Sequence, residues 1–286
     1  MEINTKRVVE AWKEELELRC SNLEKAPILE IIVAPGYSSA STKYVSNKLA
    51  LAKDLGIETV LTEVQWEGLD NATIKQNLIK ELKESGKSDV NGVIVQLPFP
   101  GVTEEEISHL IPAHKDVDGF TDIQKLKLIN NEKDALVPCT AKGVMKILHE
   151  VCGNDLSGKS IAIVNRSNLI GMPLFHLALH NNMTPMICHS KTQFIDAHFK
   201  IADIIVTGCG RRKIYSASNF AFNPTIIDCS MTLSKEHKGV GDCDKEDILS
   251  KKPGIKIASG YGHTGPMTVC ALMDNVIQAY LQQGGR

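Results

Sequence analysis

Two series of short apolar runs, each interrupted by stretches with helical periodicity, constrain the fold of this 286-residue chain more than any other feature. Such runs do not alternate with polar residues, which is typical of parallel strands covered on both faces. The first series predicts strands at 28–34, 58–64 and 92–97, with helices near 41–55 and 72–85. The second series predicts strands at 160–165, 184–189, 203–208, 225–230 and 255–259, with helices near 171–181 and 193–200.

The chain therefore belongs to the α/β class and is expected to form two lobes. Residues 1–140 predict an N-terminal three-layer α/β lobe, and residues 141–267 a Rossmann-like lobe with a parallel sheet. The seam lies near 137–153, where a proline and small residues lead into a helix that Gly153 ends. The apolar spacing after residue 267 predicts a terminal helix that returns to the first lobe, so 268–286 are assigned to that lobe.

Charge and hydropathy exclude several classes of function. With 32 Lys+Arg against 34 Asp+Glu, the net charge is -2, so no broad basic field is expected and non-specific nucleic-acid binding is not predicted. No apolar run approaches the roughly 20 residues that span a bilayer. The first twenty residues form an amphipathic charged segment rather than a signal peptide. We therefore expect a cytoplasmic protein with no membrane partner.

The cysteines indicate reduced thiols rather than a zinc site or a disulfide framework. The chain has 8 of them, without a C-x-x-C pair. Cys188 and His189 are adjacent, but neighbours on a strand point to opposite faces and do not form a nucleophile–base pair easily.

Two features of the first series could bind a small molecule. Tyr44 and Lys48 are four residues apart and share a helix face, so they could contact one ligand. The alternative is that the tyrosine ring only packs beside a solvated lysine, because such a pair has the same spacing. Gln96 ends an apparently buried strand that Pro98 and Pro100 then stop. Ligands of open α/β sheets gather at the carboxyl ends of strands, so Gln96 either offers an amide to a ligand or satisfies nearby backbone.

A pair of acids follows in the same lobe. Asp116 and Asp118 lie two residues apart before Gly119. Such pairs usually cap a helix or solvate a loop, and a metal ion would need more oxygen ligands nearby. The pattern requires no metal.

The junction at 164–174 in the second series favours a phosphate ligand, because a strand-to-helix turn presents backbone N–H groups and the positive end of the helix dipole. It is not the G-x-G-x-x-G fingerprint, since Asn165 occupies the position of the opening glycine. Donors to phosphate and ribose would be Arg166, Ser167 and Ser190. No acid follows the next strand, which favours NADP over NAD.

Taken together, these residues resemble the bifunctional methylenetetrahydrofolate dehydrogenase/methenyltetrahydrofolate cyclohydrolase family, called FolD in bacteria. The shared motifs occur in order: S-x-x-Y-V-x-x-K (41–48), G-V-I-V-Q-L-P (92–98), K-D-V-D-G (115–119), P-C-T (138–140), R-S-x-x-x-G-x-P (166–173), C-H-S-x-T (188–192), V-G-D (240–242) and G-P-M-T (265–268).

The resemblance implies a multifunctional enzyme that oxidises 5,10-methylenetetrahydrofolate with NADP and hydrolyses the methenyl product to 10-formyltetrahydrofolate. Its partners would be one-carbon derivatives of tetrahydrofolate, in one-carbon metabolism and purine biosynthesis. The first lobe with the terminal helix would hold folate, the second lobe NADP, and the substrate would lie in the cleft between them. Family members are usually homodimers.

The resemblance also implies roles for individual residues. Lys48 would be the acid/base and polarising group, Tyr44 would line the pterin site, Gln96 would support Lys48 and the ligand, and Asp118 would hydrogen-bond the pterin ring. The remaining substrate contacts would be Val95, Leu97, Gly262, Gly265 and Pro266. The cofactor contacts would be Asn165, Arg166, Ser167, Ser190 and Met231.

The chain departs from the family pattern at 257–268, which reads I-A-S-G-Y-G-H-T-G-P-M-T instead of ending in T-P-V-P-G-G-V-G-P-M-T. The changes include Tyr261 and His263, and His263 is either a new functional group or a solvated loop residue. Asn165 replaces a glycine, and we expect it to keep the cofactor turn because Asn tolerates left-handed backbone.

These departures leave alternatives open. They are a monofunctional dehydrogenase and a non-catalytic folate- or nucleotide-binding paralogue. A dehydrogenase for an amino or hydroxy acid is disfavoured, because the first lobe shows neither an Arg clamp nor a His–Asp dyad at a strand end.

Overall fold

The computed structural model describes residues 1–220, 222–232, 239–260 and 262–285, without the side chains of residues 39–41. The chain forms two compact units. One, here called the three-stranded unit, contains Trp12–Cys139 and Val269–Arg286. The other, the five-stranded unit, contains Met1–Ala11 and Thr140–Thr268.

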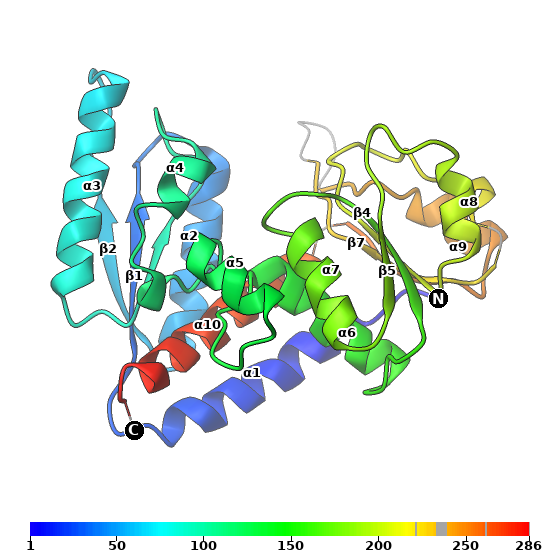
Figure 1. The fold of residues 1–286 in the computed structure, drawn as a ribbon, viewed down its shortest axis with the longest axis horizontal. Coiled ribbons are helices and arrows are strands. Elements are labelled where there is room, and N and C mark those ends of the chain that lie inside the picture. Colours follow the sequence, from blue (N-terminus) through cyan, green and yellow to red (C-terminus); the bar gives the residue numbers. More distant parts are fainter. Residues whose placement is uncertain (221, 233–238, 261, 286) are drawn as a thin grey trace. The chain divides into compact units, whose positions relative to one another are not determined.

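The three-stranded unit is built on a parallel sheet with strand order β2-β1-β3. Its strands are β1 (Ile28–Val33), β2 (Glu58–Glu63) and β3 (Gly92–Val95). Its helices within the first series are α2 (Ser39–Asp54), α3 (Asn71–Lys87), α4 (Glu104–Ser108) and α5 (Asp122–Ile129). β1 lies in the centre, and its Leu29, Ile31 and Ile32 are completely buried. In Figure 1, α2 and α3 flank the strands that they connect.

The edge strand β2 differs from the sequence prediction, which expected every strand to be covered on both faces. Residues Glu58–Leu61 are all exposed, including Val60 and Leu61. The prediction is wrong for this strand because an edge position and the polar residues Glu58, Thr59 and Glu63 leave it open to solvent.

The terminal helix α10 (Thr264–Gln282) returns to the three-stranded unit through residues Val269 onward, as predicted. It packs along α1 (Thr5–Ser21), whose Trp12 and Leu16 are buried, and Asp274 of α10 pairs with Arg19 of α1 (Figure 1). Apolar residues of α10 such as Val276 and Ile277 are completely buried, which explains the apolar spacing in the sequence.

The five-stranded unit contains a parallel sheet with strand order β5-β4-β6-β7-β8. Its strands are β4 (Ser160–Val164), β5 (Thr184–Ile187), β6 (Ile204–Thr207), β7 (Thr225–Asp228) and β8 (Lys256–Ala258). Its helices include α6 (Cys139–Cys152), α7 (Gly171–His180), α8 (Ile195–Lys200) and α9 (Lys245–Lys251). From β4 the chain moves to β5 on one side and then to β6 on the other, so the strand order reverses at β4, where ligands of such folds bind.

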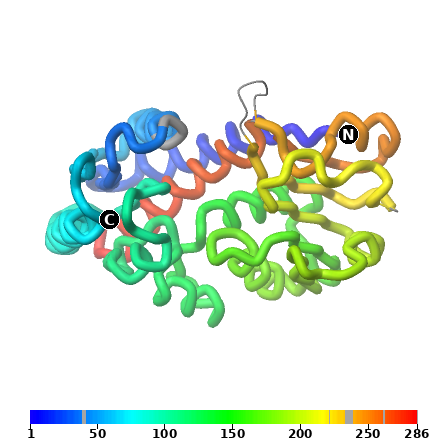
Figure 2. Tube along the Cα trace, turned by 90° about the horizontal axis from the view of Figure 1, so that it is seen from above, coloured from blue at the N-terminus to red at the C-terminus, as the bar shows by residue number. Residues whose placement is uncertain are grey.

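The first residues of the chain extend the five-stranded sheet beside β8 (Figure 2). Ile3 N donates to Ile257 O at 2.8 Å, and Ile257 N donates to Met1 O at 3.0 Å. The sequence division assigns all of residues 1–140 to the first lobe, whereas these bonds place Met1–Ala11 in the five-stranded unit. The difference arises because such pairing depends on backbone atoms, which carry no side-chain pattern.

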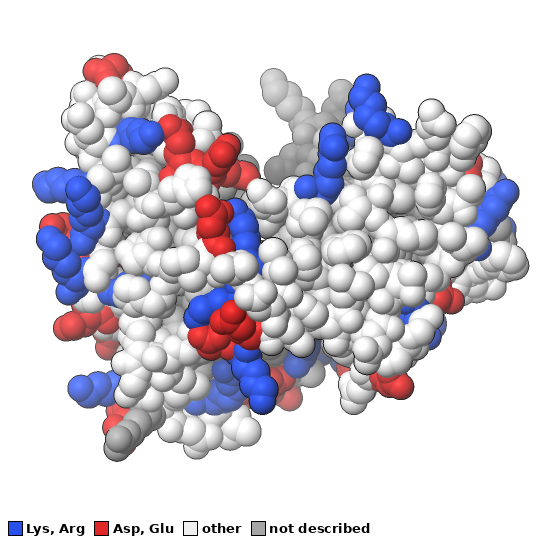
Figure 3. All heavy atoms as spheres, in the orientation of Figure 1, with Lys and Arg blue, Asp and Glu red and all other residues white. Residues whose placement is uncertain are grey.

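Basic and acidic side chains are interspersed on the face drawn in Figure 3, and neither sign forms a continuous field there. Among the described residues, no helix combines the length and the apolar character needed to cross a bilayer.

Candidate active site

Lys48 and Gln96 form a hydrogen-bonded pair in the three-stranded unit. Lys48 lies on α2, and Gln96 follows the last residue of β3 at the carboxyl edge of the sheet. The Nζ of Lys48 donates to Gln96 Oε1 at 2.8 Å. The amide of Gln96 also donates through Nε2 to Leu97 O at 2.8 Å, so its oxygen is the atom presented to the lysine. Gln96 therefore satisfies nearby backbone, which is one of the two alternatives considered from sequence, and it also binds Lys48. The other alternative, an amide offered to a ligand, stays a prediction.

Burial lowers the pKa of the Lys48 ammonium, whereas the negative charge of Asp118 opposes that shift. A lysine in such surroundings exchanges a proton closer to neutral pH than a solvated one. Tyr44 lies one turn earlier on the same helix and is half-buried. The helix spacing therefore brings Tyr44 and Lys48 to one face, as predicted.

The two acids of the K-D-V-D-G turn differ in environment. Asp116 is completely buried and accepts from Gly119 N at 2.9 Å and Thr121 N at 2.7 Å. Burial raises the pKa of Asp116 to about 6, against the effect of these hydrogen bonds. Asp118 is half-buried and is the carboxylate whose charge acts on Lys48. Asp116 thus shapes the turn, and Asp118 is the acid available to a ligand.

The turn is anchored on both sides. Lys115 is buried, and its Nζ donates to Ser85 O and Ser88 O at 2.7 Å each, which ties the turn to the end of α3. Gly119 has a φ of +72°, and a Cβ there would lie 2.4 Å from Leu136 O. Only glycine fits, because this backbone conformation and this close approach both exclude a side chain.

Sequence reasoning gave no role to two residues of this region. Cys139 is buried, and its Sγ donates to Val117 O at 3.5 Å. Asn275 of α10 is completely buried and donates to Val117 O and Val137 O at 2.8 Å each. The sequence did contain a signal for Asn275, because it is an asparagine within the apolar face of a helix, and a buried amide must find hydrogen-bond partners.

In the five-stranded unit, the turn after β4 is organised by the side chain of Asn165. Its Oδ1 accepts from Ser167 N at 2.7 Å and Gly171 N at 3.1 Å, and its Nδ2 donates to Gly208 O at 2.6 Å. Asn165 is not among the residues with positive φ, so the expected left-handed backbone is wrong. The side chain bridges the turn instead. Gly171 is required, because a Cβ there would lie 2.2 Å from Asn165 O.

The predicted phosphate and ribose donors lie exposed at the carboxyl edge of this sheet. Arg166 and Ser167 follow β4, and Ser190 follows the neighbouring strand β5. His189 N donates to Thr192 Oγ1 at 2.9 Å, which closes the turn that carries Ser190. The sequence after β5 has no acid through Thr192, so nothing at this position repels a 2′-phosphate. Cys188 is buried in the core of this unit, as expected for a structural thiol.

Two buried carboxylates hold the other loops at this edge. Asp242 accepts from Cys209 N at 2.6 Å and Arg211 N at 2.7 Å. Asp228, at the end of β7, accepts from Ser230 N, Cys243 N and Ser259 Oγ, and burial raises its pKa. Met231 follows this strand and is half-buried.

The divergent loop before α10 is tied to the first residues of the chain. His263 Nδ1 lies 2.9 Å from Thr5 Oγ1, and His263 Nε2 lies 3.0 Å from Glu2 Oε1. Burial lowers the pKa of His263, which favours the neutral ring. Both ring nitrogens of His263 thus have partners in the first residues of the chain, so the ring is not simply solvated. Gly262 has a φ of +88°, and Gly265 and Pro266 are exposed in the first turn of α10.

Four further residues were named from the sequence. The side chain of Val95 is buried in the core, and Leu97 is half-buried after Gln96. Tyr261 and the side chain of Ser41 lie outside the described residues.

The comparisons with known proteins match the two halves of the sequence separately. Residues 3–118 match the family model "Tetrahydrofolate dehydrogenase/cyclohydrolase, catalytic domain", and residues 138–284 match "Tetrahydrofolate dehydrogenase/cyclohydrolase, NAD(P)-binding domain". The chain is 34% identical over 282 residues to the bifunctional protein FolD of Acetivibrio thermocellus, covering 97% of this chain and 95% of that protein.

Two solved structures share the fold over almost the full length. A bifunctional FolD methylenetetrahydrofolate dehydrogenase/cyclohydrolase from Campylobacter jejuni has a TM-score of 0.90 and 27% identity, covering 99% of both chains. The corresponding enzyme from Thermoplasma acidophilum has a TM-score of 0.88 and 27% identity, also covering 99% of both chains.

Proposed function

Because the chain belongs to the tetrahydrofolate dehydrogenase/cyclohydrolase family, we propose that it oxidises 5,10-methylenetetrahydrofolate with NADP and hydrolyses the methenyl product to 10-formyltetrahydrofolate. The main support for the proposal is the hydrogen-bonded pair of Lys48 and Gln96. The Lys48 ammonium is desolvated, and the charge of Asp118 acts on it. The two family-model matches cover residues 3–118 and 138–284, so both halves of the enzyme are represented in this chain.

In the oxidation, the carbon between N5 and N10 loses hydride because the nitrogen lone pairs stabilise the cation that forms. NADP supplies the hydride acceptor. The protein then chiefly needs to hold the folate in place, for which Tyr44 lines the pterin site and Asp118 hydrogen-bonds the pterin ring. Fixed geometry of this kind accounts for a large part of many enzymatic rate enhancements.

In the hydrolysis, water adds to the methenyl carbon, and protons must leave the water oxygen and reach a ring nitrogen before the bridge opens. Lys48 performs this transfer. Burial already lowers the pKa of its ammonium, and a cationic substrate beside it would lower that pKa further. Gln96 keeps the amine aimed, because its own amide is fixed by Leu97 O.

The carboxyl edge of the five-stranded sheet supports NADP as the cofactor. Arg166 and Ser190 supply exposed donors for the 2′-phosphate, and the exposed side chain of Ser167 supplies a donor for the pyrophosphate. Met231 follows β7 and would lie near the nicotinamide. The remaining substrate contacts are Val95, through its backbone, together with Leu97, Gly262, Gly265 and Pro266.

A spectrophotometric assay tests the proposal directly. The protein is mixed with 5,10-methylenetetrahydrofolate and either NADP⁺ or NAD⁺, and methenyl formation and decay are followed separately. We expect both steps, with a clear preference for NADP⁺. Methenyl accumulation without decay above the uncatalysed rate would indicate a monofunctional dehydrogenase, which the altered 257–268 loop keeps as the second candidate. Binding without turnover would indicate a non-catalytic paralogue.

We also propose that the protein works in the cytoplasm as a homodimer, in one-carbon metabolism that supplies purine biosynthesis. The support is family membership. Light scattering coupled to size-exclusion chromatography tests the oligomeric state, and a monomer at micromolar concentration would contradict it.

A further inference from the structure

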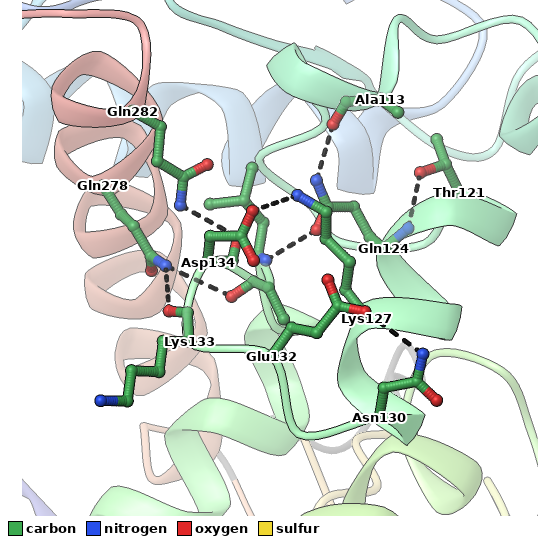
Figure 4. A network of polar contacts seen from close by, with 12 residues as sticks. Ala113, Thr121, Gln124, Lys127, Asn130, Glu132, Lys133, Asp134, Gln278 and Gln282 are labelled. Atoms are coloured by element: carbon green, nitrogen blue, oxygen red, sulfur yellow. Dashed lines mark hydrogen bonds and ion pairs between the residues drawn. The ribbon is translucent and has the colours of Figure 1, made fainter.

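One face of α10 carries a row of amide side chains, here called the amide row: Asn275, Gln278 and Gln282. Gln278 and Gln282 bind the segment before α6, as Figure 4 shows. Gln278 Nε2 donates to Lys133 O at 3.5 Å and Ala135 O at 3.3 Å, and Gln282 Nε2 donates to Asp134 O at 2.9 Å. Asn275 continues the row one turn earlier and, unlike Gln278, has no exposed surface.

The carbonyls that Asn275 binds belong to the Lys48 site. Its Nδ2 donates to Val117 O, directly before Asp118, and to Val137 O, two residues before Cys139. The same nitrogen lies 3.7 Å from Cys139 Sγ. Asp118 supplies the negative charge that acts on Lys48, and Cys139 is a second group in the surroundings of the lysine. One NH₂ group on α10 therefore joins the two segments that carry them.

The internal bonds of the K-D-V-D-G turn set its shape, and they leave its position to external contacts. Asp116 holds the turn from within by accepting from Gly119 N and Thr121 N. Gly119 packs directly on the backbone of 136–138, where a Cβ would lie 2.7 Å from Pro138 N. A displacement of the 136–138 segment must consequently move the turn, and the side chain of Asn275 binds both.

We propose that Asn275 is a positioning residue for the reaction, which holds Asp118 and Cys139 in place around Lys48 through the carbonyls of Val117 and Val137. The inference rests on the proposed function. It predicts that the hydrogen-bond donors of residue 275, rather than its size, support turnover.

The test uses the full-length protein and the isosteric change Asn275→Asp, with the matched change Gln278→Glu as control. A neutral carboxylic acid at 275 can donate one hydrogen bond, and a carboxylate can donate none. Burial among carbonyls raises the pKa of such a group. We expect kcat for methenyl hydrolysis to fall about tenfold or more at pH 8, and the ratio of variant to unmodified enzyme to recover as the pH falls toward 6. The KM for NADP⁺ should change less than twofold, and Gln278→Glu should stay within about twofold of the unmodified enzyme at every pH.

A second variant keeps the test decisive if Asn275→Asp fails to fold. Asn275→Ser should lower kcat roughly tenfold in the otherwise unmodified enzyme but less than about twofold in an Asp118→Asn background, because residues that act through one another are not additive. Equal losses in both backgrounds, or a similar loss in Gln278→Glu, would overturn the inference. If the unmodified enzyme turns over no folate, the proposed function fails; if it is active and the Asn275 variants match it, the inference alone fails.

Discussion

The Lys48 site and the carboxyl edge of the five-stranded sheet both use buried carboxylates to hold backbone, yet they present their ligand groups differently. Asp116 in the first, and Asp228 and Asp242 in the second, accept from backbone N–H groups. Lys48 and Asp118 are then half-buried, whereas Arg166 and Ser190 are exposed. This difference in exposure follows from the two tasks. Proton transfer needs a desolvated charge, whereas recognition of a phosphorylated ligand needs rigid backbone and accessible donors.

Lys48→Met gives the largest expected effect, and it tests whether proton chemistry belongs to the Lys48 site alone. Methenyl hydrolysis should fall about 10²–10⁴-fold, because the acid/base group is lost. NADP⁺ binding by calorimetry should be unchanged, since its donors lie in the other unit. Lys53→Met, on the exposed last turn of the same helix, is the matched control and should behave as the unmodified enzyme. Normal hydrolysis in Lys48→Met would remove the assignment.

Asp116 tests the cost of a buried carboxylate in the same region. Burial raises the pKa of Asp116 from 3.8 to about 6, so between these pH values the folded chain keeps a proton that the unfolded chain has released. The unfolding free energy therefore contains a contribution that falls as pH rises through this window, by up to roughly 3 kcal/mol. Asp116→Asn should flatten that slope in urea titrations at a series of pH values. An identical slope in both proteins would show that Asp116 does not titrate there.

Ser190→Asp tests the exposed donors of the other region. A carboxylate at this position should raise the KM for NADP⁺ about 10–100-fold through repulsion of the 2′-phosphate and leave the KM for NAD⁺ nearly unchanged. Ser157→Asp makes the same change before β4, at the amino ends of the strands, and should have little effect on the KM for either cofactor. If both variants discriminate equally between the two cofactors, Ser190 is not near the 2′-phosphate.

His263→Ala gives the smallest expected effect and asks whether the divergent loop is structural. The loss of hydrogen bonds to Thr5 and Glu2 should lower the unfolding free energy by about 1–2 kcal/mol, measured by urea denaturation. Neither reaction rate should change by more than about twofold. A large loss of hydrolysis with unchanged stability would instead make His263 a functional group.

Sequence patterns were sufficient for the strands and for the helix face shared by Tyr44 and Lys48, because burial on both faces and helical spacing are local properties. The same holds for Gln96, whose position after a buried strand predicts a place at the carboxyl edge of the sheet. The edge position of β2 was not predictable, since the order of strands in a sheet depends on contacts between distant segments.

Motif reasoning also identified Asn165 as a residue of the cofactor turn. It attributed the turn to left-handed backbone at Asn165, because the replacement of a glycine suggests a backbone role. In the structure, the side-chain amide bridges Ser167, Gly171 and Gly208 instead. Hydrogen bonds of this kind depend on where other chain segments arrive, and no single-residue preference encodes them.

Residue patterns predict two parallel α/β units, a lysine four residues after a tyrosine, and a nucleotide edge without an acid. Three further features follow from the folded chain: Met1–Ala11 joins the second sheet, His263 is tied to Glu2 and Thr5, and Asn275 reaches the carbonyls beside Asp118. The physical reason is that periodicity reports which face of an element is buried. The choice among distant partners is made by backbone and amide groups, whose need for hydrogen bonds is the same in every sequence.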